Sequence, residues 1–244
     1  MKAMTSNNII ALNYENTHEV EQLRRIRTNI EYAMIDAKYK IINFTSTIAG
    51  VGKTTTACNL ALLFANKFEK VLFIDADLRK PAVHKNFKIS SSMGLSDLLL
   101  DYAKHDLKLD NIEFKNYIKS FQHETLLNNL EILVAGSRIQ NPTDILASKT
   151  FAQLLKDLAK NYDLILIDSA PCGFIVDGII TSSVSDGTVI VTEYNKDRKD
   201  TVKEMLKNLS KADVKIIGGI ISKVPKKRFD YFNRYYYEYQ YKDE

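Results

Sequence analysis

Residues 45–61 read TSTIAGVGKTTTACNLA, and this stretch decides the fold. A short β-rich run, residues 40–45, leads into it, and a helical pattern over residues 53–66 follows. Gly50 and Gly52 lie between the two, where the lack of a side chain lets the backbone come close to a ligand. Backbone N–H groups of such a loop, with a helix N-terminus behind them, bind phosphate oxygens. The stretch therefore predicts a phosphate-binding loop between a strand and a helix.

Two side chains of this loop have the chemistry that a bound nucleotide requires. The ammonium of Lys53 would lie between the β- and γ-phosphates of ATP, and the hydroxyl of Thr54 would complete the coordination of Mg²⁺. Thr47 stands where the usual pattern has a glycine, so a chance glycine turn before a helix is the alternative interpretation. The loop residues predicted to bind the nucleotide are Thr47, Ala49, Gly50, Val51, Gly52, Lys53, Thr54 and Thr55.

Two apolar runs end in an aspartate. The run 70–75, KVLFID, ends in Asp75 and is soon followed by Asp77, and the run 163–168, DLILID, ends in Asp168. Ligands of open α/β sheets bind at the carboxyl ends of the strands, where a carboxylate can hold Mg²⁺. An attacking hydroxyl also needs a carboxylate to accept its proton, and the sequence leaves open whether Asp75 or Asp77 does so. The predicted catalytic residues are Lys53, Asp75, Asp77 and Asp168, and the predicted metal ligands are Thr54, Asp75, Asp77 and Asp168.

The rest of the chain alternates between apolar runs and helical patterns. Further β-rich runs lie at 131–134, 187–192 and 214–221, and helical patterns lie at 17–38, 143–160 and 198–212. Near-continuous apolar runs indicate strands buried on both faces, and their alternation with helices indicates right-handed crossovers. The sequence therefore predicts an α/β fold with a doubly wound, mostly parallel central sheet flanked by helices, as in P-loop NTPases. Residues 93–130 are less regular, and we expect short helices and loops in a surface insertion there.

The composition is that of a soluble globular protein. The chain has 244 residues, of which 45% are hydrophobic and 26% are charged, with a formal net charge of +4. This charge is modest and spread out, so it gives no indication of a nucleic-acid partner. Cys58 and Cys172 lie in no metal-ligand spacing, which favours buried, reduced thiols. Because no signal-peptide pattern and no apolar stretch of about 18 residues is present, we expect a cytoplasmic location.

A row of charges lies on the first predicted helix. Glu21, Arg24 and Arg27 follow one another at three-residue steps and therefore lie on one side of it. From the residues alone, a solvated face is the simplest interpretation of such a row.

Residues 226–244 differ from the rest of the chain in composition. They carry charges, almost no aliphatic side chains and six tyrosines, which predicts a flexible tail behind a catalytic domain at residues 1–225. A sticky aromatic segment and a segment that stacks on nucleic-acid bases are the alternatives. On a chain with a phosphate loop and two acidic strands, phosphorylation of these tyrosines is the favoured interpretation. The predicted phosphoacceptors are Tyr231, Tyr235, Tyr236, Tyr237, Tyr239 and Tyr241.

In these motifs the chain resembles the bacterial tyrosine kinases of capsule and exopolysaccharide biosynthesis, over about residues 15–241. Residues 45–61 are similar to the Walker A motif of that family, residues 74–87 (IDADLRKPAVHKNF) to its Walker A′ motif, and residues 164–171 (LILIDSAP) to its Walker B motif. Residues 94–99 (GLSDLL) and 135–148 (AGSRIQNPTDILAS) resemble further blocks. The late run departs from the family at Ser222, where many members have an asparagine that is expected to read the base.

The resemblance implies an ATP-dependent protein-tyrosine kinase with ATP and Mg²⁺ as cofactors. It implies phosphorylation of the tyrosine tail in trans within a homo-oligomeric ring, which Glu21, Arg24 and Arg27 would help to assemble. It adds Arg79 to the residues expected to bind the nucleotide.

The resemblance also implies a partner and a place of action. A membrane-bound chain-length regulator would activate the kinase and recruit it to the inner face of the cell membrane. There the kinase would regulate polysaccharide synthesis and export. Contact with the membrane would be made only through this partner.

Two other functions share the phosphate loop. A partition or positioning ATPase uses hydrolysis as a switch on DNA or a membrane, usually carries a signature lysine where this chain has Ala49, and has no tyrosine tail. A non-catalytic, nucleotide-gated scaffold for polysaccharide export would keep the loop. A Lys53→Met variant separates the scaffold from the kinase, because only the kinase requires its tail phosphotyrosine to disappear.

Overall fold

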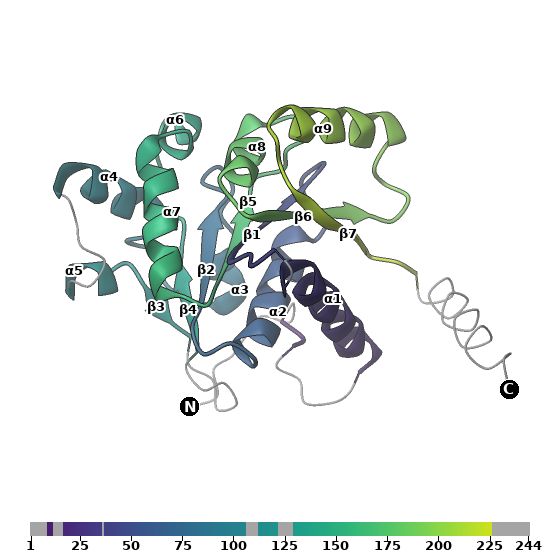
Figure 1. Ribbon diagram of the computed structural model, residues 1–244, viewed down its shortest axis with the longest axis horizontal. Helices are drawn as coiled ribbons and strands as arrows, with labels where there is room; N and C mark the ends of the chain where they lie inside the picture. The colour runs from purple at the N-terminus through teal and green to yellow at the C-terminus, as the bar shows by residue number, and fades with distance from the viewer. Residues whose placement is uncertain (1–8, 12–16, 36, 106–111, 122–128, 226–244) are drawn as a thin grey trace, which may run out of the picture.

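The computed structural model describes residues 9–11, 17–35, 37–105, 112–121 and 129–225, and the predicted tail at 226–244 lies outside this part of the chain. Within it, one seven-stranded sheet has the order β3-β4-β2-β5-β1-β6-β7 (Figure 1). The strands are β1 (Ile41–Ser46), β2 (Val71–Ala76), β3 (Lys119–Ser120), β4 (Leu130–Leu133), β5 (Leu164–Ser169), β6 (Gly187–Glu193) and β7 (Ile216–Ser222). Neighbouring strands are parallel except β3 and β4, which confirms the predicted doubly wound, mostly parallel sheet.

Helices cover both faces of the sheet (Figure 1). They are α1 (His18–Ile35), α2 (Lys53–Ala65), α3 (Val83–Phe87), α4 (Leu95–His105), α5 (Ile112–Lys115), α6 (Pro142–Leu146), α7 (Lys149–Asn161), α8 (Val176–Ser183) and α9 (Lys199–Lys211). Strand β5 shows why the apolar runs are continuous. Leu164 and Leu166 pack in the core on the side of α1 and α2, whereas Ile165 and Ile167 pack on the side of α4 and α7. Alternate side chains of a central strand thus enter two different cores.

The strand order determines where the site is formed. Strand β5 lies between β1 and β2, so the phosphate loop that follows β1 and the aspartates at the ends of β2 and β5 meet at one edge of the sheet. Asp75 and Asp168 are direct partners in the register of β2 and β5. The sequence motifs that are far apart in the chain therefore converge because parallel strands all end at the same edge.

Three details of the fold differ from the sequence-based expectation. The helix expected at 143–160 is two helices, because the Ser148 side chain accepts the N–H of Phe151 and starts α7 anew after α6. Residues 93–130 are not simply a surface insertion, since α4 buries Leu95, Leu98 and Leu99 in the core and packs against α7. Helix α8 was not expected at all.

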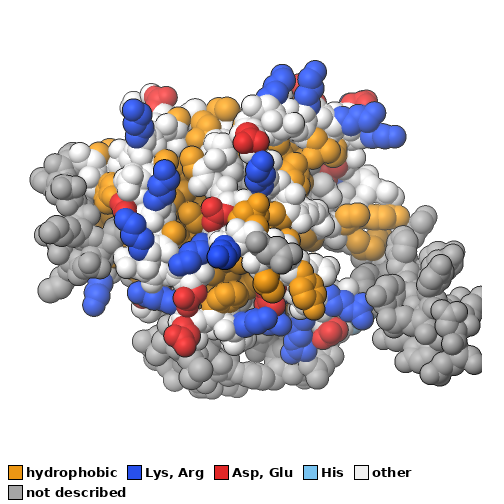
Figure 2. Space-filling view, viewed as in Figure 1, with side chains coloured by type: hydrophobic (Ala, Val, Ile, Leu, Met, Phe, Trp, Pro, Cys, Tyr) orange, Lys and Arg blue, Asp and Glu red, His pale blue; other side chains and the backbone are white. Residues whose placement is uncertain are grey.

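The remaining composition-based expectations concern cysteines, charge and membranes. Cys58 and Cys172 are both free and buried, as expected. On the face shown in Figure 2, described Lys and Arg side chains are spread among acidic and hydrophobic ones. None of the helices in the described ranges has the length and apolar character that crossing a bilayer requires.

The charged row on α1 has two different environments. Arg24 contacts Glu21 at 3.3 Å, and both side chains are about half exposed, at 40% and 51%. Arg27 instead lies against α2: its Nε is 3.2 Å from Glu31, and its Nη1 donates to the carbonyl of Leu63 at 3.4 Å. Glu31 also pairs with Lys67 at 2.5 Å. The expectation of one solvated row is therefore wrong for Arg27, which joins α1 to α2 within the chain.

Substitutions in this row are expected to separate stability from assembly. Arg27→Ala should lower the free energy of unfolding by about 1 to 3 kcal/mol, because it removes the ion pair with Glu31 and the hydrogen bond to the Leu63 carbonyl. A Glu21→Ala/Arg24→Ala double variant should unfold at the wild-type midpoint but lose mass by light scattering if this exposed pair contacts another subunit. An unchanged mass for the double variant would return Glu21 and Arg24 to the role of a solvated surface.

Candidate active site

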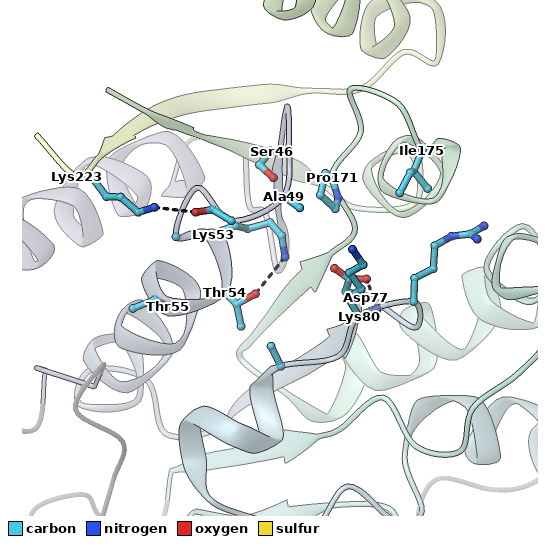
Figure 3. A pocket seen from close by; sticks show the side chains of 14 residues that line it. Ser46, Ala49, Lys53, Thr54, Thr55, Asp77, Lys80, Pro171, Ile175 and Lys223 are labelled. Atoms are coloured by element: carbon cyan, nitrogen blue, oxygen red, sulfur yellow. Dashed lines mark hydrogen bonds between the residues drawn. The ribbon is translucent and has the colours of Figure 1, made fainter. Parts of the chain in front are cut away.

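A cavity of about 470 Å³ opens at the edge of the sheet where β1, β2 and β5 end. It is lined by Ser46, Ala49, Gly50, Gly52, Lys53, Thr54, Thr55, Asp77, Arg79, Lys80, Ala82, Pro171, Ile175 and Lys223. Figure 3 shows Lys223 and Thr55 on one side of this cavity, with Pro171, Ile175 and Asp77 across it. Most of the predicted phosphate loop thus faces one open space.

The loop has the backbone geometry of a phosphate cradle. Gly50 and Gly52 have φ angles of +80° and +88°, in the left-handed region that favours glycine. Gly52 directly precedes α2, so the cavity receives the N-terminus of a 13-residue helix. Within the described residues, the N–H groups of Gly50, Gly52 and Lys53 have no protein acceptor. Unpaired donors at a helix N-terminus are the chemistry that phosphate oxygens require.

Lys53, Thr54 and Asp168 form one hydrogen-bonded group below the cavity. The ammonium of Lys53 lies 2.6 Å from Asp168 Oδ1, and the Thr54 hydroxyl donates to Asp168 Oδ2 at 2.6 Å. The Lys53 side chain is only 6% exposed, and Asp168 is fully buried. Figure 3 shows Lys53 and Thr54 turned toward each other, with their polar ends 3.4 Å apart. The structure therefore brings together the three residues on which the predicted phosphate and metal chemistry depends most.

Asp75 and Asp77 have different surroundings, which the sequence could not distinguish. Asp75 is fully buried and accepts backbone N–H groups from Ala82 and Val83 at 3.1 and 3.0 Å, where α3 begins. Its other oxygen accepts the N–H of Asp77 at 3.3 Å. Asp77 itself lines the cavity, with its Oδ1 accepting the N–H of Lys80 at 3.0 Å. Of the two carboxylates, Asp77 is the one that a ligand in the cavity can reach.

If both were ionised, Asp75 and Asp168 would carry two buried negative charges against the one positive charge of Lys53. Burial, reinforced by the charge of Asp168, raises the pKa of Asp75 to about 8. Burial also raises the pKa of Asp168, although Lys53 acts in the opposite direction. No group of three or more acidic, His or Cys side chains in the described residues is arranged to hold a metal ion by itself. This donor set fits Mg²⁺ that arrives with a nucleotide, since Mg²⁺ usually takes one or two protein ligands plus phosphates and water.

The raised pKa of Asp75 has a consequence for stability. Between about pH 4 and pH 8, the folded chain keeps a proton on Asp75 that the unfolded chain releases, so this group lowers the free energy of unfolding as the pH rises. Asp75→Asn should remove that slope. We expect urea unfolding from pH 5 to pH 8, without nucleotide, to show a flatter profile for the variant than for the wild type. His84, whose pKa burial lowers, is common to both chains and cancels in the difference. Parallel profiles would show that Asp75 is ionised throughout this range.

The other residues predicted to bind the nucleotide occupy varied positions. Ala49 and Thr55 line the cavity, whereas the Val51 side chain is fully buried beneath it. Thr47 is buried and does not line the cavity, and its hydroxyl donates to Asp197. Arg79 lies at the rim with its guanidinium already bound.

The partners of Arg79 were not predicted from the sequence. Its Nε donates to Asp177 at 2.6 Å and its Nη2 to the Thr143 hydroxyl at 2.9 Å, while Thr143 donates to Asp177 at 2.6 Å. Asp177 is buried at the start of α8. This network joins the Walker A′ segment to α6 and α8.

The end of β7 contacts the phosphate loop, a role that was also missed. The Lys223 ammonium donates to the carbonyl of Gly50 at 2.8 Å and lies 2.9 Å from Glu193. The Ser222 hydroxyl lies within hydrogen-bond distance of two carbonyl oxygens, those of Val51 and Thr192, to which it can donate. Ser222 therefore holds the loop in place, at the position where an asparagine was expected to read the base.

A second cavity, of about 600 Å³, shares Thr55 and Lys223 with the first. It extends between α1, α2 and the end of β7, and its apolar lining includes Leu23, Ile26 and Ile221. Because the two cavities share Thr55 and Lys223, one ligand can place its phosphates at the loop and its nucleoside between α1, α2 and the end of β7.

Comparisons with known proteins agree with this geometry. A family model described as an AAA domain matches residues 39–217. The tyrosine-protein kinase YwqD of Bacillus subtilis (strain 168) is 35% identical over 215 residues, which cover 88% of this chain and 85% of YwqD. The putative tyrosine-protein kinase CapB of Staphylococcus aureus is 32% identical over 219 residues, which cover 90% of this chain and 89% of CapB.

Solved structures give the same result. The crystal structure of the chimerical protein CapA2B2 has a TM-score of 0.78 at 28% identity and covers 90% of this chain and 91% of that chain. The septum site-determining protein MinD from Pyrococcus horikoshii OT3, complexed with Mg-ADP, has a TM-score of 0.58 at 25% identity and covers 75% of this chain and 69% of its own. On the combined evidence of its motifs, site and relatives, this chain belongs to the family of bacterial tyrosine-protein kinases and contains an AAA domain.

Proposed function

We propose that this protein transfers the γ-phosphoryl group of ATP to tyrosine hydroxyls. The observation that carries the proposal is the arrangement of Lys53, Thr54 and Asp168 beside a glycine loop, with Asp77 facing the same cavity. Relatives named as tyrosine-protein kinases support the choice of tyrosine as the acceptor. The Mg-ADP complex of MinD supports a magnesium nucleotide as the ligand of this cavity.

Each site residue has a role in this proposal. The unpaired N–H groups of the loop bind phosphate oxygens, and Lys53 leaves Asp168 to stabilise the charge on the transferred group. Thr54 and Asp168 would hold Mg²⁺, which neutralises the phosphate charge when it is bound. Asp77 accepts the proton of the tyrosine hydroxyl, because it faces the cavity while Asp75 is engaged with the start of α3.

The acceptors in this proposal are the six tyrosines of residues 226–244, presented by a neighbouring copy of the chain. Residues 1–225 form the catalytic domain, and the tail supplies hydroxyls at high effective concentration within a homo-oligomeric ring. Each phosphate adds about −1.5 to −2 charges at pH 7, so multiple phosphorylation gives the tail a strong negative charge. Repulsion between such tails would loosen the ring and reset it.

A place of action is part of the same proposal. We propose that a membrane-bound chain-length regulator recruits the kinase to the inner face of the cell membrane and activates it there. Cycles of phosphorylation in the ring would then control capsular or exopolysaccharide synthesis and export.

A mixing experiment tests transfer between subunits. One variant carries Lys53→Met with an intact tail, and a second keeps Lys53 but has phenylalanine at all six tail tyrosines. We expect neither variant alone to form tail phosphotyrosine with Mg·ATP, whereas their mixture should form it on the first variant. Phosphotyrosine on the Lys53→Met variant alone would point to another kinase. A silent mixture beside an active wild type would show transfer within one chain.

A further inference from the structure

The segment that follows β5 is fixed against the phosphate loop. The N–H of Cys172 donates to the carbonyl of Ser46 at 2.8 Å, and the N–H of Gly173 donates to the carbonyl of Thr47 at 3.2 Å. A Cβ atom at Gly173 would lie only 2.2 Å from the carbonyl oxygen of Thr47, so only glycine allows this approach. The residues that follow are therefore held in a defined place at the mouth of the site.

What this segment presents to solvent is hydrophobic. The Phe174 side chain is 80% exposed, Val176 is 49% exposed, and Ile175 between them lines the cavity. Figure 3 shows Ile175 beside Pro171, on the side of the cavity away from Lys223. We call Phe174, Ile175 and Val176 the apolar rim. With 80% of its surface exposed, Phe174 contributes little to the packing of the described residues.

We propose that the apolar rim binds the acceptor segment, residues 231–241 of a second copy of this chain, and that Phe174 contributes to the choice of aromatic acceptors. This inference rests on the proposed kinase function. Phe174 is a binding residue for the acceptor and takes no part in the proton or phosphoryl transfer.

The composition of the acceptor segment fits such a surface. Residues 231–241 read YFNRYYYEYQY, in which seven of the eleven side chains are aromatic and Arg234 and Glu238 cancel in charge. A neutral aromatic segment gains little binding free energy from charged surroundings. Pairs of aromatic side chains, in contrast, stabilise a complex by more than the area they bury accounts for. Because the apolar rim adjoins the cavity that Asp77 faces, an aromatic side chain held there lies next to the proposed base.

Steady-state kinetics with a synthetic peptide of residues 229–241 test this inference on the full-length chain with Mg·ATP. Phe174→Ala should raise the KM for the peptide about two- to tenfold, with an unchanged KM for ATP and an unchanged unfolding midpoint. Phe174→Tyr should retain the wild-type KM, because it keeps the aromatic ring. Leu206→Ala, at an exposed position on α9, is the matched control and should also behave as the wild type.

The possible outcomes are distinct. An unphosphorylated peptide in the wild-type reaction contradicts the proposed kinase function itself. A wild type that phosphorylates the peptide, with Phe174→Ala kinetics identical to it, contradicts only the role of the apolar rim. A raised KM for ATP in Phe174→Ala would assign Phe174 to the nucleotide instead, and this also overturns the inference.

Discussion

Replacing Lys53 with methionine is expected to lower the rate of tail tyrosine phosphorylation by at least about a hundredfold. The Lys53 ammonium lies 2.6 Å from buried Asp168 and beside the N-terminus of α2. Among the described residues, it is the single cation at that distance from Asp168. Methionine keeps the length of the side chain but supplies no charge for the transferred phosphoryl group. Quantitative phosphotyrosine mass spectrometry over a time course with Mg·ATP measures the loss.

Two controls separate catalysis from folding in this experiment. Lys53→Met leaves Asp168 buried without its ion pair, so the variant is also expected to unfold more easily. Adding Asp168→Asn removes the orphaned charge, and the double variant should regain stability while staying inactive. Lys203→Met, at an exposed position on α9, controls for the loss of a positive charge. Wild-type phosphorylation rates in a folded Lys53→Met protein would contradict the role given to this lysine.

Asp77→Asn is expected to lower kcat about 10²- to 10⁴-fold, the range for the loss of a general base. The amide oxygen of asparagine can still accept the N–H of Lys80, so the loop after β2 should keep its structure. The nucleotide affinity, measured by calorimetry with Mg·ADP, should change much less than kcat. Asp200→Asn, in the exposed first turn of α9, is the matched control and should retain the wild-type kcat.

Asp75→Asn provides the decisive contrast for the choice of base. If Asp75 rather than Asp77 accepted the tyrosine proton, Asp77→Asn would keep most of its activity and Asp75→Asn would lose it. The carboxylate of Asp75 accepts N–H groups from Ala82 and Val83, so we expect its replacement to affect stability and the start of α3 as well. A kcat loss confined to Asp75→Asn would reverse the assignment.

The parts of the fold that were predicted correctly are those with strong local patterns. Strands β2 and β5 follow from continuous apolar runs, and α2 follows from the loop that opens it. Helix α8 was missed because four of its eight residues are β-branched and one is glycine, and these residue types are weak helix formers. A Cβ atom at Gly178 would lie 2.3 Å from the carbonyl oxygen of Ala170, so the close packing of α8 against the segment after β5 requires glycine, which helix propensity alone disfavours.

The site was predictable as far as its motifs are local. Gly50, Gly52, Lys53 and Thr54 belong to one short segment, and the paired ends of β2 and β5 follow from a parallel sheet. Lys223 and Gly50 are 173 residues apart in the sequence, and Arg79 and Asp177 are 98 residues apart. No local sequence pattern predicts either contact. The same holds for Arg27, because only the packing of α1 on α2 shows that its charge is used within the chain.

Mass spectrometry of the purified chain with Mg·ATP tests the kinase proposal most directly. We expect phosphate on tyrosines within residues 231–241, only in the presence of nucleotide, and more of it when the cytoplasmic segment of a membrane partner is added. ATP consumption without phosphotyrosine would contradict the proposal and favour a switch ATPase. Neither consumption nor transfer, with or without the partner segment, would contradict it in favour of a nucleotide-gated scaffold.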